Sequence, residues 1–156
     1  MPARTSPEAT ERTGAAFDYA IIRVVPRVER GECLNVGVAL ICRPRRFLGL
    51  RIALDEARLR ALCPALSSAQ LDLLRAELDG LQRVSVGAPD AGPIARLSQA
   101  ERFHWLVSPG SSMIQPSPVH SGICHDPAVT LDRLMRELVL PPEDGERAID
   151  RAQLDS

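Results

Sequence analysis

The sequence contains no lysine, so all 19 of its basic residues are arginines. This absence excludes Schiff-base chemistry and lysine contacts to phosphate, and it leaves arginine as the only cationic side chain that is always charged at pH 7. Aromatic residues make up only 3% of the chain, so aliphatic side chains must fill any core. With 20 acidic residues the formal net charge is -1, which argues against a nucleic-acid-binding protein that acts through bulk positive charge.

Long hydrophobic runs are also missing. No apolar stretch approaches the roughly 20 residues that a membrane-spanning helix needs, and residues 1–14 lack the apolar centre of a signal peptide. We therefore expect a cytoplasmic protein. Its four cysteines form no C-x-x-C pair, and in a reducing compartment they are expected to be small buried hydrophobic residues.

The length of 156 residues and the hydrophobic content of 45% indicate one folded domain with a substantial core. Residues 1–14 are rich in polar residues and are expected to form a disordered tail. Residues 141–156 open with two prolines and continue as a second polar tail. The single domain is therefore expected to span residues 15–140.

Three β-rich segments, at residues 17–25, 34–42 and 47–54, predict strands joined by short connections, which is typical of an N-terminal antiparallel meander. Both faces of the first are largely apolar, which suggests a central strand, and Arg23 is the anomaly on an otherwise apolar face. In the second, alternation predicts one bulky face, and Gly37 indicates close approach of a neighbour. That bulky face would comprise Leu34, Val36, Val38, Leu40 and Cys42. A fourth strand is predicted over residues 112–115.

Helix signals follow the strands. Asp55 can cap a short helix that ends at Leu62, and capping boxes at Ser67 and Ser98 open helices that end near residues 82 and 107. Asp126 and Pro127 open a last helix that reaches about residue 140. Strands followed by helices predict an α+β domain: an antiparallel sheet of three to four strands packed with three to four helices.

The first polar group of interest lies between the first two strands. Glu32 could bind a cation or act as a base, with Asn35 orienting a ligand. The alternative is a structural connection, in which Glu32 pairs with an arginine and Asn35 satisfies backbone groups. The spacing alone favours this structural interpretation.

The second group lies on the helix predicted to begin at Ser98. Arg102 could bind a phosphate or a carboxylate through two parallel hydrogen bonds. The alternative interpretation gives Arg102 a structural ion pair, makes His104 a half-buried helix residue and uses Trp105, the only tryptophan, to anchor the helix to the sheet.

The third group lies in the long polar connection at residues 108–126. Long structured connections in compact domains often carry function, and Gln115, Ser117 and His120 are the candidate ligand-binding residues here. A metal site built from His120, Cys124 and His125 lacks the paired spacing of a zinc site. Nucleotide-binding glycine loops and the G-x-S-x-G serine motif are absent. We expect neither a metal nor another cofactor.

Two blocks of sequence resemble a bacterial family, the domain-of-unknown-function family 3037. The first comprises residues 17–32 (FDYAIIRVVPRVERGE) with residues 35–38 (NVGV), and the second comprises residues 101–107 (ERFHWLV) with residues 114–122 (IQPSPVHSG). The resemblance covers nearly all of residues 15–140. It implies no established activity. Members tend to lie beside genes for HipA-like kinases, which implies a functional association with such a kinase.

These signatures contain the polar residues already singled out by pattern. We hypothesise that they cluster in space, with Arg23 and Arg102 facing the polar connection and binding an anion. The candidate ligand-binding residues are Arg23, Glu32, Asn35, Arg102, His104, Gln115, Ser117 and His120.

The sequence leaves three functional hypotheses. We favour a non-enzymatic accessory or regulatory module that binds a protein partner and carries a local anion-binding site. The alternative is an enzyme, either a hydrolase or a phosphoryl-handling protein, centred on Arg102, Gln115, Ser117 and His120. A nucleic-acid-binding protein acting through Arg43, Arg45 and Arg46 has the least support, because such a cluster is more often a solvated hairpin tip and stacking aromatics are few.

Overall fold

The computed structural model describes residues 13–109 and 113–142 of the chain. The predicted N-terminal tail therefore lies almost wholly outside the described residues, and so do residues 143–156 of the predicted C-terminal tail. The described part forms an α+β fold, as predicted.

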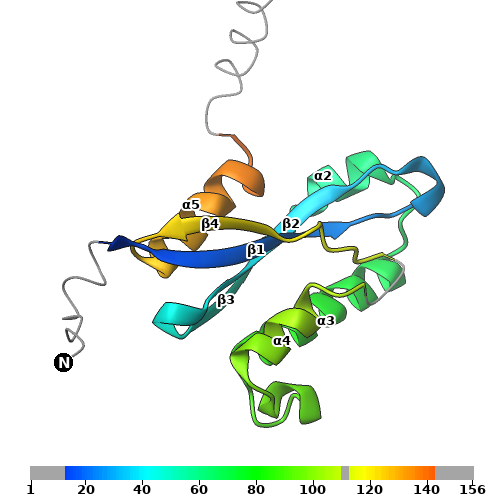
Figure 1. The fold of residues 1–156 in the computed structure, drawn as a ribbon. Coiled ribbons are helices and arrows are strands. Elements are labelled where there is room, and N and C mark those ends of the chain that lie inside the picture. The colour runs from blue at the N-terminus through cyan, green and yellow to red at the C-terminus, as the bar shows by residue number, and fades with distance from the viewer. Residues whose placement is uncertain (1–12, 110–112, 143–156) are drawn as a thin grey trace, which may run out of the picture.

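The sheet has four antiparallel strands in the order β3-β2-β1-β4 (Figure 1). Strands β1 (Ala15–Val24), β2 (Leu34–Cys42) and β3 (Phe47–Ile52) form the predicted N-terminal meander. β1 lies between β2 and β4, which confirms that the first strand is central. Its two apolar faces are therefore both available for packing.

The predicted position of the fourth strand is wrong. β4 comprises His120–Cys124, whereas Ile114 makes only an isolated bridge to Val24. Residues 111 and 112 lie outside the described residues. The physical reason is a change of register: the N–H groups of Gln115 and Ser117 still donate to the carbonyls of Arg23 and Ile21, but the Ile21 N–H donates to the Ser117 hydroxyl instead of a carbonyl. The regular ladder along β1 resumes only at His120, which lies opposite Tyr19.

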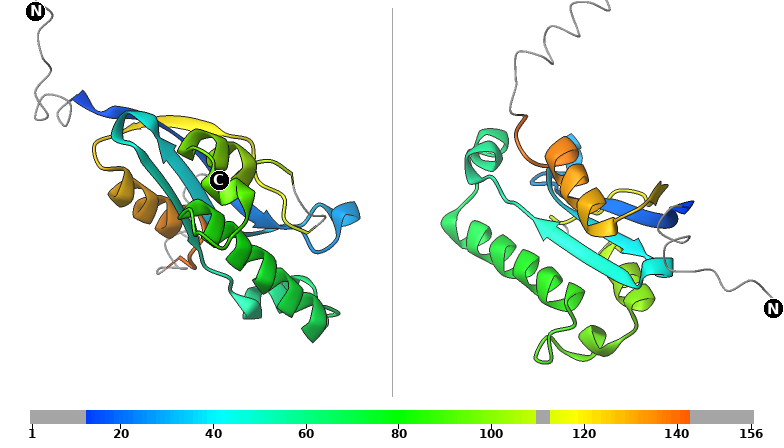
Figure 2. Two further views of the ribbon diagram at one scale, coloured as in Figure 1. Left: turned by 90° about the horizontal axis from the view of Figure 1, so that it is seen from below. Right: turned by 90° about the vertical axis from the view of Figure 1, so that its left-hand side faces the viewer.

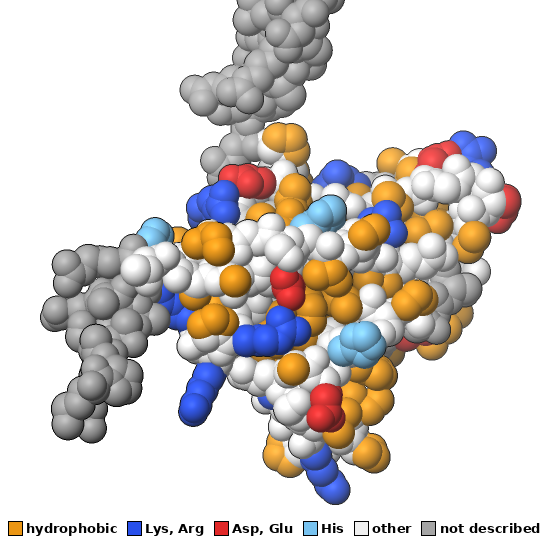
Figure 3. Space-filling model, viewed as in Figure 1, with side chains coloured by type: hydrophobic (Ala, Val, Ile, Leu, Met, Phe, Trp, Pro, Cys, Tyr) orange, Lys and Arg blue, Asp and Glu red, His pale blue; other side chains and the backbone are white. Residues whose placement is uncertain are grey.

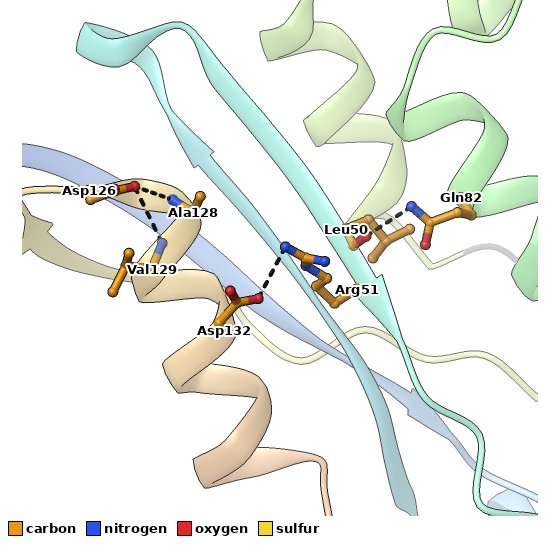
Figure 4. A network of polar contacts seen from close by, with 7 residues as sticks. All are labelled: Leu50, Arg51, Gln82, Asp126, Ala128, Val129 and Asp132. Atoms are coloured by element: carbon orange, nitrogen blue, oxygen red, sulfur yellow. Dashed lines mark hydrogen bonds and ion pairs between the residues drawn. The ribbon is translucent and has the colours of Figure 1, made fainter.

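The helices begin at the predicted caps. They are α2 (Glu56–Leu62), α3 (Ser68–Ser85), α4 (Gln99–Leu106) and α5 (Pro127–Leu138), and their N-caps are Asp55, Ser67, Ser98 and Asp126. Ser67 and Gln70 form the reciprocal capping box that the sequence predicts. The Asp126 carboxylate accepts from the N–H groups of Ala128 and Val129 (Figure 4). Three 3₁₀ helices, η1 (Val28–Arg30), η2 (Arg43–Arg45) and η3 (Pro93–Arg96), lie in the connections.

Helices cover both faces of the sheet, with α5 on one face and α3 and α4 on the other (Figures 1 and 2). The buried side chains accordingly form two clusters. The α3/α4 side includes Ile22, Val24, Val36, Ala39, Ile41, Leu50, Leu59, Leu71, Leu74, Leu78, Phe103 and Leu106. The α5 side includes Phe17, Val38, Leu40, Cys42, Cys124, Leu131, Leu134, Met135 and Val139.

A β-bulge in β2 overturns the predicted single bulky face of that strand. Ile22 pairs with Gly37 and Arg23 pairs with Asn35, so Val36 is the extra residue. Leu34 and Val36 consequently pack on the α3/α4 side, while Val38, Leu40 and Cys42 pack on the α5 side. One inserted residue moves all later side chains of a strand to the opposite face.

The close approach predicted at Gly37 is confirmed, and the neighbour is the backbone of β3. A Cβ atom built on Gly37 would lie 2.5 Å from the carbonyl oxygen of Arg51 and 2.8 Å from Cδ1 of Ile52. Glycine at this position therefore lets β2 and β3 come together beside the bulge.

The described cysteines are free, and their burial differs. Cys42 and Cys124 are buried, as expected, and burial raises the pKa of the Cys124 thiol. The expectation is wrong for Cys33, which is exposed in the connection between β1 and β2. None of the helices in residues 13–109 and 113–142 is long and apolar enough to cross a membrane.

Asp18 links β1 to β4 and to the hairpin that joins β2 to β3. Its carboxylate accepts from the Ser121 hydroxyl at 2.7 Å and from Arg43 Nη1 at 3.0 Å. The hydrogen bond from Ser121 is the main cause that lowers the pKa of Asp18, and the contact with Arg43 lowers this pKa further.

We predict that Asp18→Asn lowers the free energy of unfolding at pH 7 by about 1 kcal/mol or less, because the charged pair is partly solvated. A lowered folded-state pKa stabilises the native chain above the unfolded-state pKa, and this contribution disappears as the pH falls through the folded-state value. The free energies of unfolding measured in urea should therefore differ at pH 7 and converge as the pH falls below the lowered folded-state pKa of Asp18. A difference in the free energy of unfolding that stays constant as the pH falls would contradict a stabilising role for the Asp18 carboxylate.

Candidate functional site

Arg23 fastens the segment of residues 113–117 to β1. Its Nε donates to the carbonyl of Gln115 at 3.0 Å, and its Nη2 donates to the carbonyl of Pro116 at 3.2 Å. Two main-chain hydrogen bonds join the same two segments. The Gln115 N–H donates to the Arg23 carbonyl at 2.9 Å, and the Val25 N–H donates to the Met113 carbonyl at 2.6 Å. Arg23, the polar anomaly on an otherwise apolar face of β1, thus holds a neighbouring segment in place.

Ser117, which lies between the two prolines, continues this attachment to β1. Its buried hydroxyl accepts from the Ile21 N–H at 2.8 Å and donates to the Pro118 carbonyl at 2.9 Å. The Ser117 N–H donates to the Ile21 carbonyl at 2.8 Å. The hydroxyl therefore takes the place of the backbone carbonyl that would accept from the Ile21 N–H in a regular ladder.

Asn35 and His120 lie on the same side of the sheet as Arg23, the side that α5 partly covers. Asn35 Nδ2 donates to the carbonyl of Leu138 at the end of α5, at a distance of 3.0 Å. His120 lies opposite Tyr19, with 5.3 Å between the ring centroids. The structure therefore gathers five of the sequence-predicted residues around β1: Arg23, Asn35, Gln115, Ser117 and His120.

Arg102 lies on the opposite side of the sheet and fastens α4 to the end of α3. Its Nη1 donates to the carbonyls of Val84 at 3.2 Å and Ser85 at 2.7 Å, and its Nε donates to the carbonyl of Leu97 at 3.1 Å. The last carbonyls of a helix have no partner within the helix, so a guanidinium satisfies them well. The structure does not bring Arg102 and Arg23 together, and the shared anion pocket stays a prediction without support from these contacts.

Glu32 and His104 lie apart from both the residues gathered around β1 and the contacts of Arg102. Glu32 forms an ion pair with Arg30 in the connection between β1 and β2. His104 is exposed on α4, and its carbonyl accepts from the Ser108 hydroxyl at 2.6 Å. Within the two described stretches, no group of three His, Cys, Asp or Glu side chains is placed to hold a metal ion.

A largely apolar groove of about 530 Å³ lies on the α3/α4 side. Side chains from α3, η3, α4 and the segment fastened by Arg23 form its walls, principally Leu81, Val84, Ile94, Trp105, Ile114 and Pro116. Hydrophobic side chains reach the surface over this part of the molecule (Figure 3). We call this feature the apolar groove.

Trp105 occupies a wall of the apolar groove and is 38% exposed. The interpretation that it anchors α4 to the sheet is wrong, because Phe103 and Leu106 are the buried residues of that helix. The indole is therefore presented to solvent, on a helix whose neighbouring residues hold it firmly. Aromatic side chains of this kind are enriched where proteins bind one another.

Sequence reasoning did not find the apolar groove, because its walls come from four separate segments. Most of the lining residues are apolar types that the sequence pattern cannot distinguish from residues of the core. One signal was available: Trp105 does not share the helical stripe of Phe103 and Leu106, which a helical projection of residues 99–106 would have shown.

The fold and the site together define an α+β domain with a four-stranded antiparallel sheet, helices on both faces and an apolar groove. A family described as "Protein of unknown function (DUF3037)" has a sequence model that matches residues 19–139. The chain belongs to this family, as its two sequence blocks indicate. Comparisons with curated proteins and with solved structures found no match.

Proposed function

We propose that the chain is a non-enzymatic accessory or regulatory module that binds a protein partner through the apolar groove. The observation that supports this proposal is the groove itself, with an exposed tryptophan in a wall that is otherwise largely apolar. Clefts of this kind offer hydrophobic surface whose burial favours binding, and tryptophan is among the commonest binding hot spots.

The two singled-out arginines support the proposal indirectly. Arg23 fixes the segment that contributes Ile114 and Pro116, and Arg102 fixes α4 against the end of α3. Both are positioning residues in this account, because their hydrogen bonds hold two walls of the groove. A preformed groove binds more tightly than one that must be ordered on binding.

The chemistry of the groove defines the kind of partner. Glu77 is the only charged residue among the groove-lining residues described, so the complementary surface should be an apolar segment. The family context implies a HipA-like kinase as the first protein to test. Local anion binding is a separate proposal, supported only by the grouping of Arg23 with Asn35 and His120 on the other side of the sheet.

The enzymatic alternative has less support. Its four residues are divided between the two sides of the sheet, because Arg102 lies apart from Gln115, Ser117 and His120. In addition, the Ser117 hydroxyl is already engaged by the Ile21 N–H and the Pro118 carbonyl. A serine nucleophile needs a base within hydrogen-bonding reach, and neither contact supplies one.

The proposal predicts that Trp105→Ser reduces capture of the partner from a native lysate at least tenfold, since truncation of a hot spot costs about 2 kcal/mol or more. Leu73→Ser is the matched control: Leu73 is 60% exposed on α3 and lies outside the groove. Quantitative mass spectrometry of the captured proteins is the measurement. Equal capture by the native chain and by both variants would contradict the proposal.

A further inference from the structure

The outer edge of β4 differs from the outer edge of β3. At β3, Gln82 Nε2 donates to the carbonyl of Leu50 at 2.9 Å, and Arg51 pairs with Asp132 of α5 at 3.1 Å (Figure 4). β4 is the opposite edge of the sheet, and no strand of residues 13–109 or 113–142 pairs with its outer side. An uncovered edge can pair with another strand.

The hydrogen-bonding pattern shows which groups this edge presents. Bonds from Gln115 to Arg23 and from Ser117 to Ile21 show that odd-numbered residues of β1 direct their backbone groups towards β4. Because Tyr19 lies opposite His120 and this alternation continues along β4, the even-numbered residues of β4 face β1. The N–H and C=O groups of Ser121 and Ile123 therefore point outwards.

The side chains along this edge favour association. Ile123 is 69% exposed and Val119 is 45% exposed, and they lie on either side of Ser121. Residues 119–123 contain no Asp, Glu or Arg, although proteins commonly place charges on edge strands to prevent pairing. The Ser121 hydroxyl is already engaged by Asp18, whose charge is balanced by Arg43.

We propose that β4 pairs antiparallel with β4 of a second copy of this chain about a twofold axis at Ser121. In this register the outward groups of Ser121 face those of the second Ser121. Ile123 faces Val119 of the second copy, so each exposed aliphatic side chain gains an apolar neighbour. The two sheets become one continuous sheet. This inference goes beyond the proposed function and does not depend on it.

Other twofold registers satisfy this edge less well. An axis at Val119 would bring in Ser117, whose N–H is directed towards Ile21. An axis at Ile123 would place Ser121 opposite His125, which lies beyond the end of β4. An axis at His120 would place Ile123 opposite Ser117, and an axis at Gly122 would place Val119 opposite His125. Only an axis at Ser121 pairs the outward groups of Val119, Ser121 and Ile123 among themselves.

Molecular mass in solution tests the association. Sedimentation equilibrium should give a dimer for the native chain and for Ser121→Ala, and a monomer for Ser121→Pro and Ile123→Glu. The N–H that proline removes at residue 121 points outwards, so the β1 ladder stays intact, and Ser121→Ala controls for loss of the hydroxyl that bonds Asp18. Unchanged circular dichroism of the monomeric variants confirms that they are folded. A monomeric native chain, or a folded Ser121→Pro variant that stays dimeric, would overturn the proposal.

Cysteine cross-linking tests the register. In a Cys33→Ser background, Ser121→Cys should form a covalent dimer on mild oxidation, because opposite residues in a hydrogen-bonded pair are about 5.5 Å apart at Cα and a disulfide spans that distance. Ile123→Cys should cross-link much more slowly, since it faces Val119. Equal rates would contradict the axis at Ser121. Trp105→Ser should leave both results unchanged, which separates this test from that of the groove.

Discussion

Replacement of Arg102 by alanine is expected to lower the free energy of unfolding by about 2–4 kcal/mol. The substitution leaves the carbonyls of Val84, Ser85 and Leu97 without their charged donor. Hydrogen bonds to charged groups contribute more than neutral ones. The Val84 carbonyl still accepts from the Gly87 N–H, whereas the part-buried Ser85 carbonyl loses its 2.7 Å bond from Arg102 and carries a desolvation cost. Urea denaturation monitored by circular dichroism measures the loss.

Arg60→Ala is the control for this experiment, because Arg60 is exposed on α2 and its removal should change stability by no more than about 0.5 kcal/mol. Arg102→Lys should recover little, since one ammonium group does not reproduce the planar array of donors. If Arg102→Ala were as stable as Arg60→Ala, Arg102 would not be the residue that holds α4 to α3.

Replacement of Arg23 by alanine is expected to lower the free energy of unfolding by about 1–3 kcal/mol. Its two hydrogen bonds to the carbonyls of Gln115 and Pro116 bring residues 113–117 onto β1. Without them the main-chain bonds between this segment and β1 should open more often. Amide hydrogen exchange should therefore accelerate at Val25 and Gln115, whose N–H groups bond across the two segments.

The same substitution should weaken partner binding, although Arg23 does not line the apolar groove. Ile114 and Pro116 would lose the support that fixes their positions, so binding would have to order them first. Arg136→Ala, an exposed arginine on α5, is the control. Protected exchange at Val25 and Gln115 in Arg23→Ala, together with undiminished binding, would show that the arginine does not position this wall.

Local signals made much of the fold predictable from the sequence. Asp55, Ser67, Ser98 and Asp126 begin the helices because each side chain satisfies backbone N–H groups within its own first turn, which requires no knowledge of distant residues. The three meander strands were predictable for the same reason, since alternation and short connections are local.

Features that depend on pairing between distant segments were not predictable in this way. The bulge at Val36 is visible only in the register of β2 against β1, and it divides the predicted bulky face between two cores. The fourth strand was misplaced because its position depends on where the ladder along β1 can resume after Pro116 and Pro118.

The candidate site shows a similar limit. Polar residues in apolar surroundings were correctly identified as unusual, and Arg23 and Arg102 each make multiple hydrogen bonds. Residue types alone do not distinguish an arginine that binds an anion from one that binds backbone carbonyls. The apolar groove was missed because its walls are assembled only by tertiary packing of four segments.

The fluorescence of Trp105 tests the central claim most directly, because it is the only tryptophan in the chain and lies in the wall of the groove. Titration with a purified, captured partner whose tryptophans have been replaced should shift the emission to shorter wavelength and reduce quenching by acrylamide, as the indole leaves water. Both changes should occur, with the same midpoint as binding measured by sedimentation. Confirmed binding with unchanged emission and quenching would contradict it.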